Sequence, residues 1–116
     1  MVKVKINGKT YNVGELGFSH YTYIEEQGCS IVEAFNKKQF MLMAMGFTCV
    51  ACECDRAEAE KIIQQHVLGG GSVLDIVSAF EKAISQSDFF QRMLGMKVET
   101  TEDPKQEKKA KTDQES

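Results

Sequence analysis

The sequence predicts a mainly helical fold: a small helical domain with an amino-terminal β-hairpin packed on it, followed by a disordered tail. Three patterns predict this. Residues 2–13 alternate apolar and polar side chains around an Asn-Gly pair, residues 40–52 are almost entirely apolar or small, and residues 55–90 contain repeated helix caps before apolar stripes. We therefore expect a helical domain over residues 1–98. Residues 99–116 are charged, with almost nothing apolar, and are expected to form a disordered tail.

The composition indicates one soluble domain. The chain has 116 residues, of which 42% are hydrophobic and 27% charged, so a core can form without a disulfide or metal. A net charge of -3 without a strong basic block gives no electrostatic footprint for nucleic acid. The alternating amino terminus lacks the apolar run of a secretion signal, and four cysteines without such a signal indicate a reducing compartment.

The hairpin is predicted over residues 2–13, where Asn7-Gly8 supplies two residues that tolerate positive φ. A lone hairpin is barely stable in water, so its apolar face must pack on the helices that follow. After a connection over residues 14–17, Ser19 is expected to cap a short helix that ends at Gly28. Ser30, with Glu33 three residues later, forms a capping-box pattern that starts another short helix.

The segment from Phe40 to Cys52 is apolar or small at every position except Thr48, so it has no polar side. A helix of this kind is buried, and with 13 residues it is too short to span a membrane. We expect it to be the central helix. The alternative, that this segment forms an interface rich in methionine, stays open.

Two amphipathic helices are expected next. Asp55 caps the first, whose stripe is expected to end at Gly69, and Ser72 caps the second. The short loop between them predicts an antiparallel pair. The two inward faces consist of Ala59, Ile62, Ile63, His66 and Val67, and of Val73, Ile76, Val77, Phe80 and Ile84. Ser87 or Asp88 begins a last short helix, which stops near Gly95.

Cys49, Cys52 and Cys54 are the candidate metal ligands, with His66 as the candidate fourth ligand. The second ligand pair of a structural zinc site is missing, and free cysteine also behaves as a small buried apolar group. We therefore expect no metal and no cofactor. A metal-sensing or thiol-sensing protein built on this cluster stays as the alternative.

The sequence contains no recognisable catalytic pattern. His20 and His66 have no nucleophile or carboxylate partner at a recognisable spacing, so structural roles are expected for both. The glycines at 69–71 lie before a helix without the lysine of a phosphate-binding loop. The protein is therefore not expected to be an enzyme.

Five methionines, at positions 41, 43, 45, 93 and 96, give an adaptable apolar surface or fill the core. The first three are expected to lie mostly in the core, because a helix that is apolar all round is usually buried. The apolar residues of the last helix are expected to be available to a partner instead of lying in the core, since this helix adjoins the expected tail. Its apolar residues are the predicted partner-binding residues: Phe89, Phe90, Met93 and Leu94.

Residues 2–96 resemble tail assembly chaperones of long-tailed bacteriophages and prophages, most clearly over residues 57–90. The resemblance is carried by residues 59–70, by Leu74, Ile76 and Phe80, and by Ser87-Asp88-Phe89-Phe90, with a similar hairpin at Ile6-Asn7-Gly8-Lys9. The segment from Phe40 to Cys54 matches no signature of that family.

The resemblance implies a helper of virion morphogenesis in the host cytoplasm that is absent from the finished virion. Its partners would be the tape measure protein, the tail tube protein and further copies of itself, without nucleic acid or membrane. The family also implies a longer form made by a programmed frameshift, for which Lys108-Lys109 is the candidate site. A generic oligomeric scaffold is a further alternative.

Overall fold

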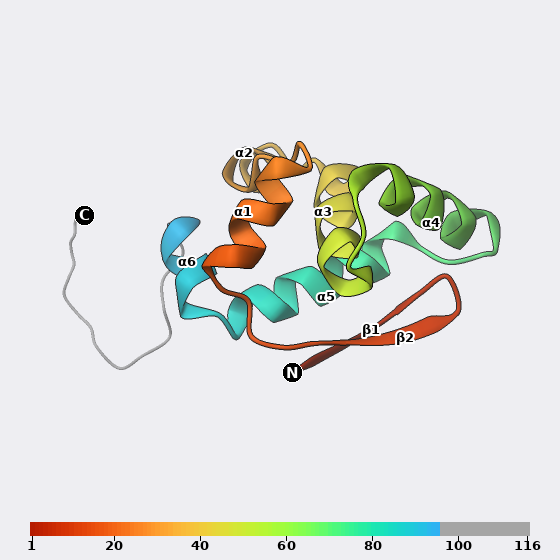
Figure 1. Cartoon of the computed structure of the whole chain (residues 1–116), viewed down its shortest axis with the longest axis horizontal. Coiled ribbons are helices and arrows are strands. Elements are labelled where there is room, and N and C mark those ends of the chain that lie inside the picture. The colour runs from red at the N-terminus through yellow and green to blue at the C-terminus, as the bar shows by residue number, and fades with distance from the viewer. Residues whose placement is uncertain (96–116) are drawn as a thin grey trace.

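The computed structural model describes residues 1–95, which form two strands and six helices (Figure 1). The mainly helical fold with an amino-terminal hairpin is as predicted. The expected tail over residues 99–116 and the candidate frameshift site Lys108-Lys109 lie outside the described residues. In chain order the elements are β1 (Val2–Ile6), β2 (Lys9–Val13), α1 (Phe18–Glu26), α2 (Ile31–Asn36), α3 (Phe40–Cys52), α4 (Arg56–Leu68), α5 (Val73–Ser85) and α6 (Asp88–Met93).

The hairpin forms over the predicted residues, with its turn at the predicted Asn7-Gly8 pair. β1 and β2 are antiparallel, with Val4 opposite Tyr11, and Asn7 (φ 52°) and Gly8 (φ 83°) form the turn between them. The apolar residues of β1 are all buried, because β1 packs on α5 while β2 packs on α3. The helices therefore cover the apolar face that an isolated hairpin would expose.

α3 is the central helix, as predicted. Its residues from Met43 to Cys49 are all buried, and α1, α2, α4, α5 and β2 all contact it (Figure 1). α1 crosses it where Gly46 lies against Ile24. The first turn of α3 differs, since Phe40 and Met41 are exposed.

Of the two predicted caps of the short helices, one is wrong and the other lacks its side-chain hydrogen bond. Gly17, not Ser19, is the N-cap of α1, and the Gly17 backbone N–H donates to Nδ1 of His20 at 3.0 Å. This bond gives His20 a structural role, because it binds an N–H group at the helix start. Ser30 does precede α2, but its side chain makes no capping hydrogen bond. Both helices are stabilised mainly by the residues they bury against α3.

The later helices begin at the predicted caps. The side chains of Asp55, Ser72 and Ser87 accept hydrogen bonds from backbone N–H groups at the starts of α4, α5 and α6. α4 ends at Gly69 as predicted, and the left-handed residue that follows the cap is Gly70 (φ 99°). α4 and α5 run in opposite directions, as the short loop predicted, but both pack mainly on α3 and contact each other only slightly (Figure 1).

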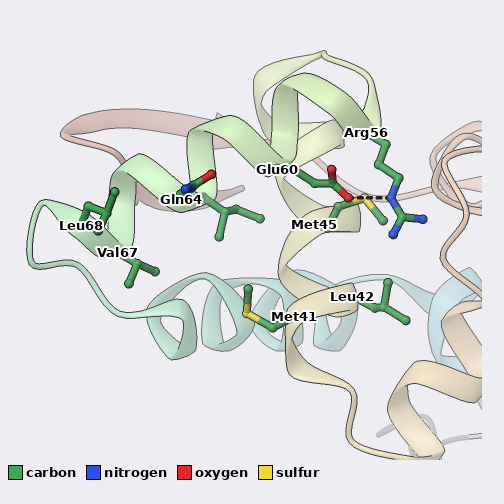
Figure 2. A pocket seen from close by; sticks show the side chains of 9 residues that line it. Met41, Leu42, Met45, Arg56, Glu60, Gln64, Val67 and Leu68 are labelled. Carbon is green, nitrogen blue, oxygen red and sulfur yellow. Dashed lines mark hydrogen bonds and ion pairs between the residues drawn. The ribbon is translucent and has the colours of Figure 1, made fainter.

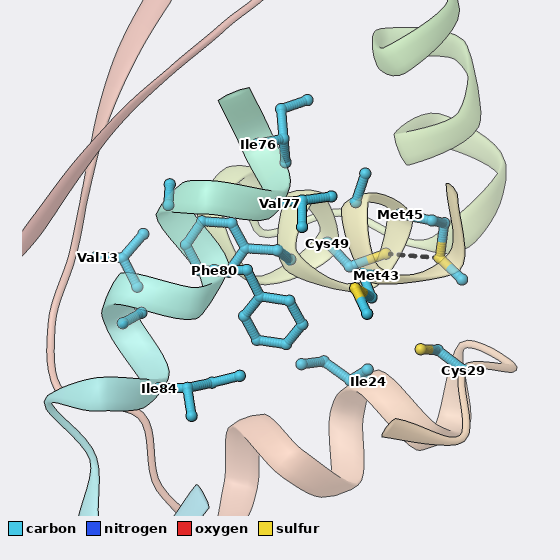
Figure 3. Packing of buried hydrophobic residues seen from close by; sticks show 14 of the residues in the cluster. Val13, Ile24, Cys29, Met43, Met45, Cys49, Ile76, Val77, Phe80 and Ile84 are labelled. Carbon is cyan, nitrogen blue, oxygen red and sulfur yellow. Dashed lines mark hydrogen bonds between the residues drawn. The ribbon is translucent and has the colours of Figure 1, made fainter. Parts of the chain in front are cut away.

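The core is centred on Phe80 of α5, which is fully buried between α3 and α1 (Figure 3). Its ring stacks on Phe47 at a centroid distance of 4.9 Å and meets the edge of Phe35 at 5.4 Å. Thr48 is also fully buried, and its hydroxyl has no hydrogen-bond partner among the described residues. This position is the polar exception in an otherwise apolar core helix.

Candidate functional site

An apolar groove runs between the first half of α3 and the outer side of α4 (Figure 2). It encloses about 420 Å³. Its lining residues are Met41, Leu42 and Met45 of α3, and Arg56, Glu60, Ile63, Gln64, Val67 and Leu68 of α4. The groove is therefore built from two helices that diverge and leave apolar side chains without a covering element in residues 1–95.

The residues at the open end of the groove are strongly exposed. The exposed fractions are 59% for Met41, 45% for Val67 and 79% for Leu68. Met45 and Ile63 form its base and are almost fully buried. Adjoining apolar side chains exposed to this extent are typical of a surface that binds another molecule.

Polar residues occupy only the edge of the groove. Arg56 Nε and Glu60 Oε2 form an ion pair at 2.8 Å, so the two charges that line the groove neutralise each other (Figure 2). Arg56 also ties the start of α4 to the α1–α2 turn, because its backbone N–H donates to Oε1 of Gln27 at 2.8 Å. The groove thus favours an apolar occupant without a net charge on its docking face.

The predicted partner-binding residues are divided between core and surface. Phe90 is fully buried and packs against Tyr21 at a centroid distance of 5.2 Å, so in this structure it is a core residue and its assignment to a partner surface is corrected. Phe89 and Leu94 are half-buried, and Met93 is 46% exposed. The prediction that α6 contacts a partner can therefore rest only on these three residues.

Sequence reasoning missed two contributors to the apolar surface. Phe18, which is 70% exposed, lies beside Phe89 with ring centroids 5.9 Å apart. Leu68 was passed over as the end of the α4 stripe. Val67 was expected on the inward stripe, yet it is 45% exposed and lines the groove beside Leu68.

His66 lies where the hairpin turn meets the loop between α4 and α5, and it is only 8% exposed. Its Nδ1 accepts a hydrogen bond from the backbone N–H of Asn7 at 2.9 Å, and its Nε2 lies 3.1 Å from the carbonyl oxygen of Ser72. Both ring nitrogens are thus bonded to backbone groups. His66 has the hydrogen-bonded structural position that we expected.

The cysteines do not form a metal site in the described part of the chain. No three His, Cys, Asp or Glu side chains gather as ligands within residues 1–95. Cys49 is fully buried, and its Sγ lies 3.7 Å from the sulfur of Met45. Burial raises the pKa of Cys49 to about 12 and that of Cys54 to about 11, which keeps both thiols protonated and poorly nucleophilic at neutral pH.

Comparisons with known proteins identify no relative. No family model matches the chain, and neither a curated protein nor a solved structure is significantly similar to it. Among residues 1–95, no helix has the length and apolar character needed to cross a membrane.

Proposed function

We propose that this protein is a tail assembly chaperone of a long-tailed bacteriophage or prophage. It binds the tape measure protein in the host cytoplasm, keeps it soluble and promotes polymerisation of the tail tube protein around it. The proposal combines the resemblance over residues 57–90 with one structural observation, the apolar groove between α3 and α4. A binding surface of this kind needs no catalytic residues.

The groove suits one apolar stripe of a client helix. The α4 side has 13 residues, which corresponds to a length of about 20 Å, or three to four helical turns. Helix-in-groove recognition buries apolar residues of the client at helical spacing. The paired charges of Arg56 and Glu60 leave no net charge to attract a strongly basic or acidic peptide instead.

Methionine side chains suit a client with a long and varied surface. Met41 and Met45 line the groove, and their unbranched, polarisable side chains adapt to differently shaped apolar partners. A rod that presents many similar stripes can bind many copies of a small chaperone. Modest affinity at each site is then enough, and it permits release when the tail tube assembles.

Co-expression with a tape measure fragment tests the function and the groove together. We expect the wild-type chain to hold the fragment in solution and to co-purify with it. Met41→Glu and Leu68→Glu should each abolish co-purification, because they place a charge in the apolar groove. Both side chains are largely exposed, so circular dichroism should show an intact fold.

Met93→Glu is the matched control, because Met93 is similarly exposed but lies on α6 outside the groove. This variant should bind like the wild type. Loss of binding in Met93→Glu with retention in Met41→Glu would move the client site to α6 and refute the groove assignment. A wild-type chain that leaves the fragment insoluble and unbound would refute the chaperone function itself.

A further inference from the structure

The last turn of α4 contacts the hairpin turn on one side and is exposed to solvent in the groove on the other. Val67 and Leu68 face the groove and are 45% and 79% exposed, so burial of their side chains does little to fix this turn. His66, the preceding residue, faces the opposite way and is 8% exposed. The position of the groove wall at this end therefore depends on what His66 contacts.

The hydrogen bonds of His66 define its tautomer. A carbonyl oxygen can only accept, so the contact of Nε2 with the carbonyl of Ser72 at 3.1 Å requires a proton on Nε2. Nδ1 is then free to accept the backbone N–H of Asn7 at 2.9 Å. Beside this pair, the side-chain amide of Asn7 donates to Oε1 of Gln65 at 2.9 Å. The end of α4 is thus connected to the hairpin turn and to the start of α5.

Gly71 is the residue that lets the ring occupy this position. A Cβ atom added to Gly71 would lie 2.5 Å from Cε1 and 2.7 Å from Cδ2 of His66, too close for a real carbon contact. The loop itself is fixed, because the N–H groups of Gly70 and Gly71 donate to the carbonyls of Val67 and His66 at 3.0 and 2.8 Å. Close approach to the ring, rather than flexibility, explains the glycine at position 71.

We infer that His66 is a positioning residue for the groove. Its bonds to Asn7 and Ser72, made possible by Gly71, set where the turn carrying Val67 and Leu68 lies relative to Met41 on the opposite wall. Loosening this junction moves that wall and changes the shape of the groove without unfolding the core. The inference concerns the geometry of the groove and holds whatever molecule the groove binds.

Methyl NMR of the protein labelled with ¹³C at the methionine methyl groups tests this inference. Gly71→Ala should displace the ring, and His66→Gln should remove its paired bonds. In both variants the Met41 resonance should shift, while those of Met43 in the core and Met93 on α6 stay unchanged. The Asn7 amide should exchange with solvent about tenfold faster, as expected for the loss of one hydrogen bond.

Gly14→Ala is the matched control, since an added Cβ at Gly14 meets no atom within 4 Å and its φ is not positive. It should leave all the methionine resonances unchanged. Faster exchange at Asn7 with an unchanged Met41 resonance would overturn the inference, because the junction would then stabilise only the hairpin. If either variant unfolds, Gln65→Ala removes the exposed side-chain bond of the same junction. It should shift Met41 to a smaller extent, and the absence of any shift would equally overturn the inference.

Discussion

Replacing Gly46 with alanine is expected to destabilise the protein, although glycine in the middle of a helix is usually unfavourable. Gly46 lies in α3 at the point where α1 crosses it. In an exposed helix the same replacement would gain about 1 kcal/mol through helix propensity. The close contact between the two helices is expected to outweigh that gain.

The magnitude follows from the distance between the new methyl group and Ile24. A Cβ on Gly46 would lie 2.8 Å from Cγ2 of Ile24, whereas carbon atoms pack best at about 3.5–4.0 Å. Ile24 is fully buried, and a β-branched side chain in a helix has nearly one allowed rotamer, so relief requires α1 and α3 to move apart. Overpacking of this kind costs about 1–3 kcal/mol, which leaves a net loss of up to about 2 kcal/mol after the propensity gain.

Urea unfolding monitored by circular dichroism measures this loss, and in thermal unfolding the melting temperature should fall by up to roughly 10 °C. A double-mutant cycle supplies the control. In an Ile24→Ala background the clashing methyl group is gone, so Gly46→Ala should become neutral or stabilising. If Gly46→Ala raises the stability of the chain that retains Ile24, the reasoning from helix contact is refuted.

Three further outcomes are expected. Thr48→Val should stabilise the protein by about 1 kcal/mol in urea unfolding. It keeps the side-chain shape and removes a buried hydroxyl that lacks a partner among residues 1–95, so a loss of stability would contradict this reasoning. Lys38→Gly should raise stability by about 1 kcal/mol in thermal unfolding, since Lys38 has a φ of 56°, whereas Lys37→Gly at a φ of -96° should give no gain. Burial raises the pKa of Cys49 from 9.0 to about 12 and that of Cys29 from 9.0 to about 11, so the folded state favours the protonated thiols. The resulting stability is complete below pH 9 and is lost as the pH rises from 9 through these values, and a free energy of unfolding that stays constant from pH 8 to 11 would contradict it.

The parts of the fold predicted correctly are those whose signals lie within a few residues. Asn7-Gly8 specifies the hairpin turn because both residues must adopt positive φ, and a side chain one position before a helix can cap it wherever the helix later packs. Asp55 and Ser72 were identified as caps on this basis. Gly17 was missed because a glycine cap has no side-chain signal and Ser19 looked more suitable.

The candidate site depended on contacts that no local pattern contains. Phe90 and Met93 belong to the same short apolar helix, but Phe90 is buried against Tyr21 of α1 while Met93 faces solvent. The uniform apolar character of α3 likewise predicted burial for every turn. Whether Met41 is covered depends on the direction in which α4 leaves α3, which is a property of tertiary packing and not of either helix alone.

The amino-terminal hairpin has a consequence for how the chain folds during synthesis. Its strand β1 packs on α5, and the first residue bonds Gln86, 85 positions later in the sequence, while the Ser87 hydroxyl donates to the Leu16 carbonyl. A ribosome adding 5–20 residues per second needs roughly four to seventeen seconds to make the residues between Met1 and Gln86. Throughout that interval β1 lacks α5, the helix on which its apolar residues pack. Molecules that bind nascent chains therefore have access to the hairpin before α5 is available to cover it. The lysine residues on the outer face of β1 help to keep it from pairing with neighbouring chains.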